Sequence, residues 1–140
     1  MGWANQNLGR YEKKLVGKYI WILDDDDVCI YPDLIKDIEE QVAQHSPDVI
    51  IYKMDHGPRG VLPDVAHWEK EPEHGFIGIS AYVVRRLKWK QCAHAWSDKY
   101  YADFEFAQML FERCDKIVWR EIVASQVQCI GLGRPERELI

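Results

Sequence analysis

The clearest pattern in the chain is an apolar run that ends in four acidic residues. Residues 19–23 read Tyr-Ile-Trp-Ile-Leu, and residues 24–27 are all aspartate. A short run in which nearly every position is apolar is typical of a strand buried on both faces. The four carboxylates would follow the end of that strand, where α/β sheets bind ligands. The sequence therefore places its strongest candidate for chemistry at the end of a buried strand.

Helical periodicity marks three other segments. Apolar residues at Leu34, Ile35, Ile38 and Val42, behind Pro32, predict a helix that ends near residues 45–47. A second helix is predicted to open at Asp103, and its apolar positions are Phe104, Ala107, Leu110, Phe111 and Cys114. A looser pattern over residues 3–16 predicts a leading helix that Gly17 ends.

Strand-type runs alternate with these helices. Residues 48–54 predict a second strand and residues 75–79 a short third one, with Ser80 as the N-cap of a helix over residues 81–90. Residues 117–129 predict one or two strands, broken near residues 120–121 or 124–125. The irregular stretches 55–74 and 92–101 are longer than ordinary connections. We expect a single α/β domain over residues 1–140, with the leading helix within 1–17 and a charged tail at 134–140 that need not be ordered.

Composition narrows the class of protein. The chain has 140 residues, 47% of them hydrophobic, and a net charge of −5, which favours a globular core and argues against a general nucleic-acid binder. No Cys-x-x-Cys pair occurs, so the four cysteines predict buried free thiols rather than a zinc or redox site. No secretory signal or membrane-length apolar run is present, and we expect a cytoplasmic location.

Two acidic groups are candidates for catalysis. The Asp-x-Asp spacing of Asp24 and Asp26 suits a hard divalent cation shared with substrate phosphates, although the same acids could form a solvated turn that caps the next helix. Asp103 and Glu105 fall in the first turn of a predicted helix, where the helix dipole alone favours anions. Alternatively, one of them is a carboxylate kept ionised to accept a proton from a hydroxyl group.

Aromatic residues gather in or beside the two irregular stretches. Broad aromatic rings next to polar groups suit a carbohydrate, whose C–H faces pack on such surfaces, although each ring could equally serve packing. The candidates for contact with an acceptor are Trp68, Trp96, Tyr100 and Tyr101.

These elements, in this order, resemble a known family. The segment Tyr-Ile-Trp-Ile-Leu-Asp-Asp-Asp-Asp followed by Tyr-Pro-Asp-Leu-Ile resembles the centre of family 2 glycosyltransferases of the GT-A fold, where a strand ends in an Asp-x-Asp motif. Asn-Gln-Asn-Leu-Gly-Arg at 5–10 and Gly-Lys-Tyr-Ile at 17–20 are similar to the segments before it. Residues 75–85 resemble the acceptor-side strand and helix, and residues 102–107 stand where the family carries its catalytic acidic pair.

The resemblance implies part of a GT-A domain, a three-layer αβα sandwich with a mixed sheet. It implies sugar transfer with inversion from a nucleotide-diphospho-sugar to a carbohydrate or other hydroxyl acceptor. Asp24 and Asp26 would hold Mg²⁺ or Mn²⁺ against the diphosphate, with Asp24, Asp25 and Asp27 as the cofactor-binding residues. Asp103 would accept the proton of the acceptor hydroxyl, with Glu105 as the competing base. Apart from the resemblance, peripheral association with a membrane stays open as an expectation.

The chain also departs from the family pattern. In the family, strand–helix units that bind the nucleotide base precede the acidic motif, which begins here at residue 24. We therefore expect a fragment of a longer transferase or a natural truncation, with weak donor binding by the chain alone. We also expect an exposed sheet edge that invites self-association into a homo-oligomer.

Two other functions fit part of the pattern. Asp24 and Asp26 are similar to the nucleophile and acid/base of haloacid-dehalogenase-like phosphatases, in which residues 76–80 would be a hydrophobic strand that ends in a serine. The non-enzymatic alternative is a glycosyltransferase remnant that acts as a binding module, for which the missing nucleotide-binding half is the argument.

Overall fold

The centre of the molecule is a curled mixed sheet. The computed structural model of the chain describes residues 7–10, 12–99 and 101–128. The sheet runs in the order β1-β5-β3-β6-β2, and β4 pairs with β3 at one side. Strands β3 and β6 are parallel, whereas the other pairs are antiparallel. The strands are β1 (Tyr19–Trp21), β2 (Asp27–Cys29), β3 (Val49–Asp55), β4 (Val61–Leu62), β5 (Tyr82–Arg85) and β6 (Ile117–Val127).

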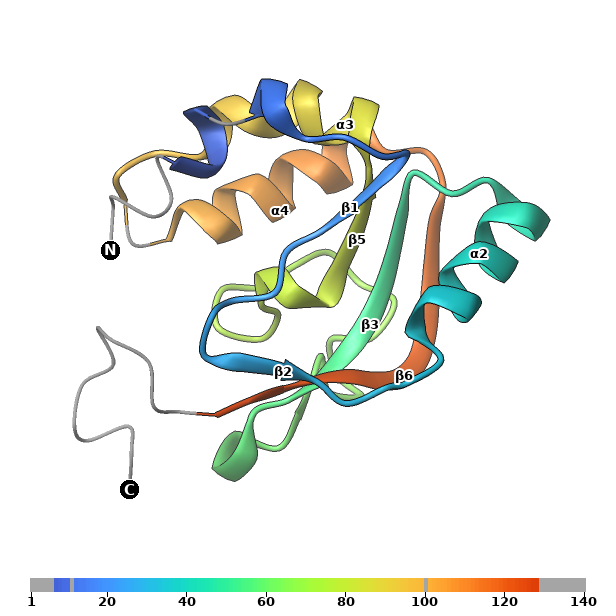
Figure 1. The fold of residues 1–140 in the computed structure, drawn as a ribbon. Coiled ribbons are helices and arrows are strands. Elements are labelled where there is room, and N and C mark those ends of the chain that lie inside the picture. Colours follow the sequence, from blue (N-terminus) through green and yellow to red (C-terminus); the bar gives the residue numbers. More distant parts are fainter. Residues whose placement is uncertain (1–6, 11, 100, 129–140) are drawn as a thin grey trace.

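Helices cover both faces of this sheet (Figure 1). One face packs against α2 (Leu34–His45), and the other against α3 (Arg86–Cys92) and α4 (Ala102–Arg113). Residues 7–10 are helical, within the predicted leading helix. There are also short 3₁₀ turns: η1 (Glu12–Lys14), η2 (Gly57–Arg59), η3 (Ile79–Ala81) and η4 (Ala93–Ala95). The predicted α/β class with a mixed sheet between helical layers is therefore confirmed.

The central strand β3 shows why the sequence folds into three layers. Val49 and Ile51 belong to the apolar cluster under α3 and α4, whereas Ile50 and Tyr52 belong to the cluster under α2. All four side chains are at most 1% exposed. Successive side chains of a strand point to opposite faces, so a continuous apolar run requires a cover on both sides.

A buried polar group fixes α2 to the sheet. The Asp37 carboxylate on α2 accepts a hydrogen bond from the Tyr52 hydroxyl at 2.7 Å. It also accepts bonds from Nε and Nη2 of Arg120 on β6, at 3.1 and 2.7 Å. Asp37 is only 4% exposed, so the guanidinium compensates a charge that is removed from water.

Strand β6 is longer and more irregular than expected. It is one strand of 11 residues, but its register against β3 shifts between Trp119 and Val123 and again between Val123 and Ser125. Both predicted breaks are therefore irregularities within one strand. Extra residues on one strand of a pair bend it, and Figure 1 shows β6 turning sharply along its length, from β3 towards β2.

The structure confirms the predicted helices α2 and α4 and the strand β3, but it corrects the segment between residues 75 and 90. Residues 75–78 form no strand, and Tyr82–Arg85, predicted as helical, is strand β5. Strand β5 pairs with β1 on one side and β3 on the other, so sheet pairing outweighs the local helical pattern. Ser80 is buried before β5 and caps no helix, because α3 begins only at Arg86. The expected buried thiols are also partly wrong, because Cys29 is exposed.

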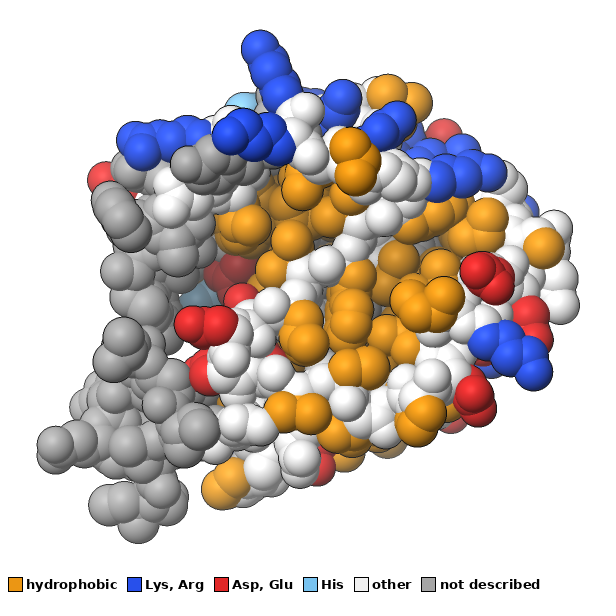
Figure 2. All heavy atoms as spheres, in the orientation of Figure 1, with side chains coloured by type: hydrophobic (Ala, Val, Ile, Leu, Met, Phe, Trp, Pro, Cys, Tyr) orange, Lys and Arg blue, Asp and Glu red, His pale blue; other side chains and the backbone are white. Residues whose placement is uncertain are grey.

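The described strand order ends at β1 and β2, each of which pairs with one neighbour. Figure 2 shows apolar side chains spread over the face of the molecule on which β1 lies. An unpaired edge next to apolar surface favours association with another strand.

The self-association expected from the sequence stays a prediction. Sedimentation velocity over a range of protein concentrations should show a rising average mass, and a concentration-independent monomer would contradict it.

Among the described helices, none is long and apolar enough to cross a membrane.

Candidate functional site

The four aspartates form a tight turn between β1 and β2. The Asp27 amide donates a hydrogen bond to the Asp24 carbonyl at 3.0 Å, which closes the turn. Its far end is fixed to the sheet, because Asp27 pairs with Val127 of β6 and the Gln128 amide donates to the Asp26 carbonyl at 3.3 Å. The acids are followed by a strand rather than a helix, and Asp33 stands at the N-cap of α2. The alternative that this turn caps the next helix is therefore wrong.

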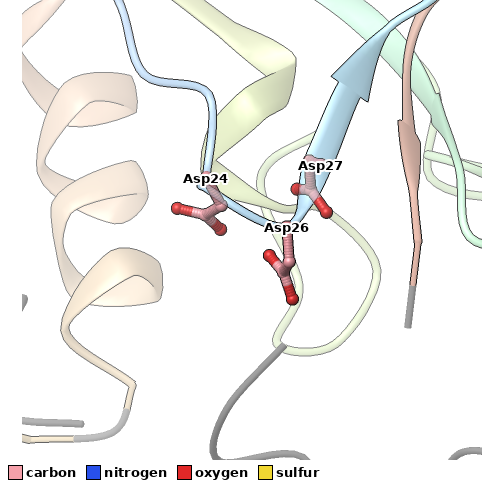
Figure 3. A group of neighbouring side chains, drawn as sticks. All are labelled: Asp24, Asp26 and Asp27. Carbon is pink, nitrogen blue, oxygen red and sulfur yellow. The ribbon is translucent and has the colours of Figure 1, made fainter. Parts of the chain in front are cut away.

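Three of the four carboxylates converge (Figure 3). One oxygen from each of Asp24, Asp26 and Asp27 lies within 4.8 Å of the others. In the described part of the chain, no other group of three or more His, Cys, Asp or Glu side chains gathers as closely. Asp25 is exposed and stands outside the group, although the sequence made it a candidate for cofactor binding.

This convergence suits a divalent cation. Three carboxylates at such distances repel one another, and a shared cation relieves the repulsion. Oxygen ligands from a few carboxylates, completed by substrate phosphates, are the usual environment of Mg²⁺, and Mn²⁺ accepts similar donors. The residues therefore fit the cation that the sequence predicts, with Asp27 as a third donor beside Asp24 and Asp26.

The start of α4 lies at the same end of the sheet as the acidic turn (Figure 1). In Figure 3 the Asp24 side chain points towards this helix. Asp103 is in the first turn of α4, and its Oδ1 accepts a hydrogen bond from the Phe104 amide at 2.8 Å. The two acidic groups that the sequence singled out are thus on the same side of the molecule.

The surroundings of Asp103 disfavour the ionised form of its carboxyl group. Burial raises the pKa of this carboxyl above its ordinary value of 3.8, while the Phe104 amide and the nearby His74 act in the opposite direction. His74 reaches α4 from the long loop, and its ring packs edge-on against Phe104 with centroids 5.4 Å apart. On the buried side stands Tyr82, whose pKa is held well above 10.0 by burial and by the Asp103 charge. The Asp103 carboxyl group therefore holds a proton more readily than an acid on the surface would.

Glu105 differs from Asp103 although it is two residues away. Its Oε1 lies 3.4 Å from Nζ of Lys99, with which it forms an ion pair. The Glu105 side chain is about one-third exposed, at 32%. The Oε1 atom of Glu105 is therefore already engaged by a cation.

The predicted acceptor-binding aromatics separate into different environments. Trp96 is 6% exposed and packs in the core against Trp89 and Phe106. Trp68 packs edge-on against Trp119 and lies under Nζ of Lys53. Tyr101 is 44% exposed immediately before α4, and Tyr100 is outside the described residues. Of the described candidates, Tyr101 presents most ring surface beside Asp103.

The loop that carries His74 is held by a second histidine, which sequence reasoning did not single out. His67 places Nδ1 2.5 Å from Oδ1 of Asp64 and Nε2 2.9 Å from Oε2 of Glu73, and its ring stacks on Phe76. When both carboxylates are ionised, both ring nitrogens can donate to them only in the imidazolium form, which this geometry therefore favours. The spacing Asp-x-x-His was visible in the sequence, but the approach of Glu73 was not.

The His67 contacts are expected to depend on pH. The hydrogen bond to Asp64 raises the pKa of His67 above 6.5, and the same bond lowers the pKa of Asp64 below 3.8. The histidine contribution to stability is complete below pH 6.5 and is lost as the pH rises through the folded-state pKa. The Asp64 contribution is present above pH 3.8 and is lost as the pH falls through its folded-state pKa, so the loop is held best between pH 3.8 and 6.5.

An NMR titration should give His67 a pKa above 6.5 that falls in Asp64→Asn; an unchanged pKa in the variant would contradict this.

Comparison with known proteins supports the fold. No protein-family model matches the sequence, and no curated protein matches it. Among solved structures, the chain is similar to residues 1–349 of S. aureus TarS, a glycosyltransferase, in complex with UDP-GlcNAc: the TM-score is 0.66 with 15% identity. The match covers 84% of this chain and 36% of that one. A second structure of TarS 1–349 gives a TM-score of 0.66 with 16% identity, covering 86% of this chain and 39% of that one.

This likeness establishes a glycosyltransferase-like fold. The chain spans less than half the length of the TarS structures that it matches. The phosphatase alternative loses one of its supports, because the strand that it requires at residues 76–80 is absent.

Proposed function

We propose that this chain carries the metal-binding and acceptor side of a glycosyltransferase that moves a sugar from a nucleotide-diphospho-sugar to a hydroxyl group. One observation carries the proposal. The carboxylates of Asp24, Asp26 and Asp27 converge at the end of β1, on the same side of the molecule as Asp103 at the start of α4. The TarS-like fold supports this interpretation, and the UDP-GlcNAc bound by TarS suggests the donor to test first.

In this proposal the acidic turn serves the leaving group. Asp24 and Asp26, with Asp27, would hold Mg²⁺ or Mn²⁺. When bound, the cation neutralises the negative charge that develops on the departing diphosphate. The turn is anchored to β6 at one end and to β1 at the other, which keeps its carboxylates in position before the donor arrives.

Asp103 would serve the acceptor. As the acceptor oxygen bonds to the anomeric carbon and the bond to the diphosphate breaks, the hydroxyl proton passes to the Asp103 carboxylate. Attack from the face opposite the leaving group inverts the anomeric centre. We assign this role to Asp103 rather than Glu105, because burial raises the pKa of the Asp103 carboxyl group and the Oε1 atom of Glu105 is already paired with Lys99.

The metal site can be tested by calorimetric titration of the chain with Mn²⁺. We expect a single binding event that Asp24→Asn or Asp26→Asn weakens by at least about tenfold, because even residues that only support metal ligands change affinity by 10–100-fold. Asp25→Asn is the matched control, since it removes one charge from the same turn but lies outside the converging group.

An equal loss in all three variants would indicate a general charge effect and would contradict the assigned ligands. UDP-GlcNAc is then added to the Mn²⁺-loaded protein. Enhanced donor binding in the presence of Mn²⁺, lost in Asp26→Asn, is the expected result.

A further inference from the structure

A cationic surface lies at the end of the sheet away from the acidic turn. Within residues 13–18 and 86–91, all six charged side chains are lysine or arginine, although the whole chain carries a net charge of −5. In Figure 2 the Lys and Arg side chains gather along the border of the molecule where Figure 1 places η1 and α3. We call the following exposed or half-buried residues the cationic patch: Lys13, Lys14, Lys18, Arg86 and Lys90. The sixth, Lys88, is left out because its Nζ donates to the Arg113 carbonyl at 3.0 Å.

The two segments of the patch are held together by the fold. The Arg86 amide donates a hydrogen bond to the Lys18 carbonyl at 2.9 Å, where β1 begins and β5 ends. Leu15 packs against the buried cluster that contains Trp89 of α3. The patch is therefore one surface built from two rigidly joined segments.

Two apolar side chains stand among these cations. Val16 is 80% exposed and Leu87 is 61% exposed. Both are close to the patch in sequence: Val16 lies between Lys14 and Lys18, two residues from each, and Leu87 directly follows Arg86. Exposed apolar side chains beside cations are typical of proteins that rest on an anionic bilayer, where the apolar side chains enter the interface and the cations meet the lipid headgroups.

We propose that the cationic patch, with Val16 and Leu87, is a docking surface for a membrane that contains anionic lipids. Charge complementarity argues for an anionic partner, and the exposed apolar tips favour a bilayer over a soluble polyanion, which has no apolar interior to receive them. Docking leaves the acidic turn clear of the lipid. From Lys18 to Asp24 the chain passes through β1 and continues beyond it, a span of at most roughly 20 Å at about 3.3 Å per residue.

The test is sedimentation with phospholipid vesicles. The chain should bind vesicles of phosphatidylcholine and phosphatidylserine more tightly than vesicles of phosphatidylcholine alone, and high salt should weaken the binding. Each removed cation is expected to weaken partitioning by about fivefold, so Lys13→Gln, Lys18→Gln and Lys90→Gln together should lower it by about 100-fold. Leu87→Gln should weaken binding by about tenfold.

Matched controls lie elsewhere on the surface. Lys36→Gln combined with Lys70→Gln removes exposed charges outside the patch, and Val65→Ser removes an apolar side chain that is 89% exposed. These variants should bind vesicles as the unchanged protein does. The proposal would be overturned if phosphatidylserine did not increase binding, or if patch and control variants lost binding equally. It would also be overturned if Leu87→Gln had no effect while heparin or a single-stranded oligonucleotide competed fully, because the surface would then bind polyanions rather than a bilayer.

Discussion

Replacement of Asp103 by asparagine is expected to lower the rate of sugar transfer by about 100- to 10,000-fold, the range that a positioned general base contributes. The same substitution should raise the free energy of unfolding at neutral pH. Burial raises the pKa of Asp103 in the folded protein above its ordinary value of 3.8. Between pH 3.8 and this raised pKa, the folded protein therefore binds more protons than the unfolded chain. Stability therefore falls as the pH rises through this interval, and a neutral asparagine removes that loss.

The two measurements together separate catalysis from structure. Transfer is measured with UDP-GlcNAc and Mn²⁺ as release of the nucleotide, and stability by urea denaturation at pH 7. If Asp103 only stabilised the start of α4, Asp103→Asn would lower stability and leave the transfer rate of the folded protein unchanged, and that outcome would contradict the assignment. Glu105→Gln is the control two residues away, and its effect on the rate should be less than about tenfold, because the ion pair that it breaks is partly exposed. Absence of transfer by the unchanged chain, together with normal folding, would favour the non-catalytic binding module instead.

Replacement of Arg120 by methionine is expected to lower the free energy of unfolding by about 3 kcal/mol. The reason is the Asp37 carboxylate, which is 4% exposed and would keep only the hydrogen bond from Tyr52. An uncompensated buried charge is one of the larger single-site effects on stability. We place the value at the low end of the usual range because Arg120 itself is 34% exposed.

Urea denaturation checks this prediction, with Arg113→Met as the matched control. Arg113 is exposed and donates to the Gln91 carbonyl at 2.8 Å, so its replacement should change stability by less than about 1 kcal/mol. The double variant Asp37→Leu with Arg120→Met should recover much of the loss, because it removes both charges. Similar values for Arg120→Met and Arg113→Met would show that the Asp37 group does not stabilise the fold as its geometry indicates.

Local pattern predicted much of the fold because several elements are coded by their own residues. The apolar run of β3 requires burial on both faces, and the 3.6-residue spacing in α2 requires a single covered stripe. The acidic turn could be predicted for the same reason, since four adjacent carboxylates that directly follow a buried strand must lie where the chain leaves the sheet. These features depend on residues that are neighbours in sequence.

Local pattern failed where distant pairing decided the outcome. Tyr82–Arg85 is a strand because β1 and β3 flank it, and neither partner is indicated by the segment itself. The contact between Asp37 and Arg120 joins positions 83 residues apart. Likewise, the approach of His74 to Asp103, and of Glu73 to His67, depends on the path of an irregular loop that no periodicity describes.

The bend in β6 has a consequence for any shortened form of the protein. This strand pairs with β3 from Ile117 to Gln126, and its last residues, Ser125 to Val127, also pair with β2, whose first residue is Asp27. Removal of the chain from Ser125 onward would keep the pairing of β3 with β6 from Ile117 to Val123 but would take away all three backbone partners of β2, at Ser125, Gln126 and Val127. A truncated protein of that kind would keep its helices and still lose the geometry of its carboxylates, so a normal circular dichroism spectrum alone would not certify an intact cation site.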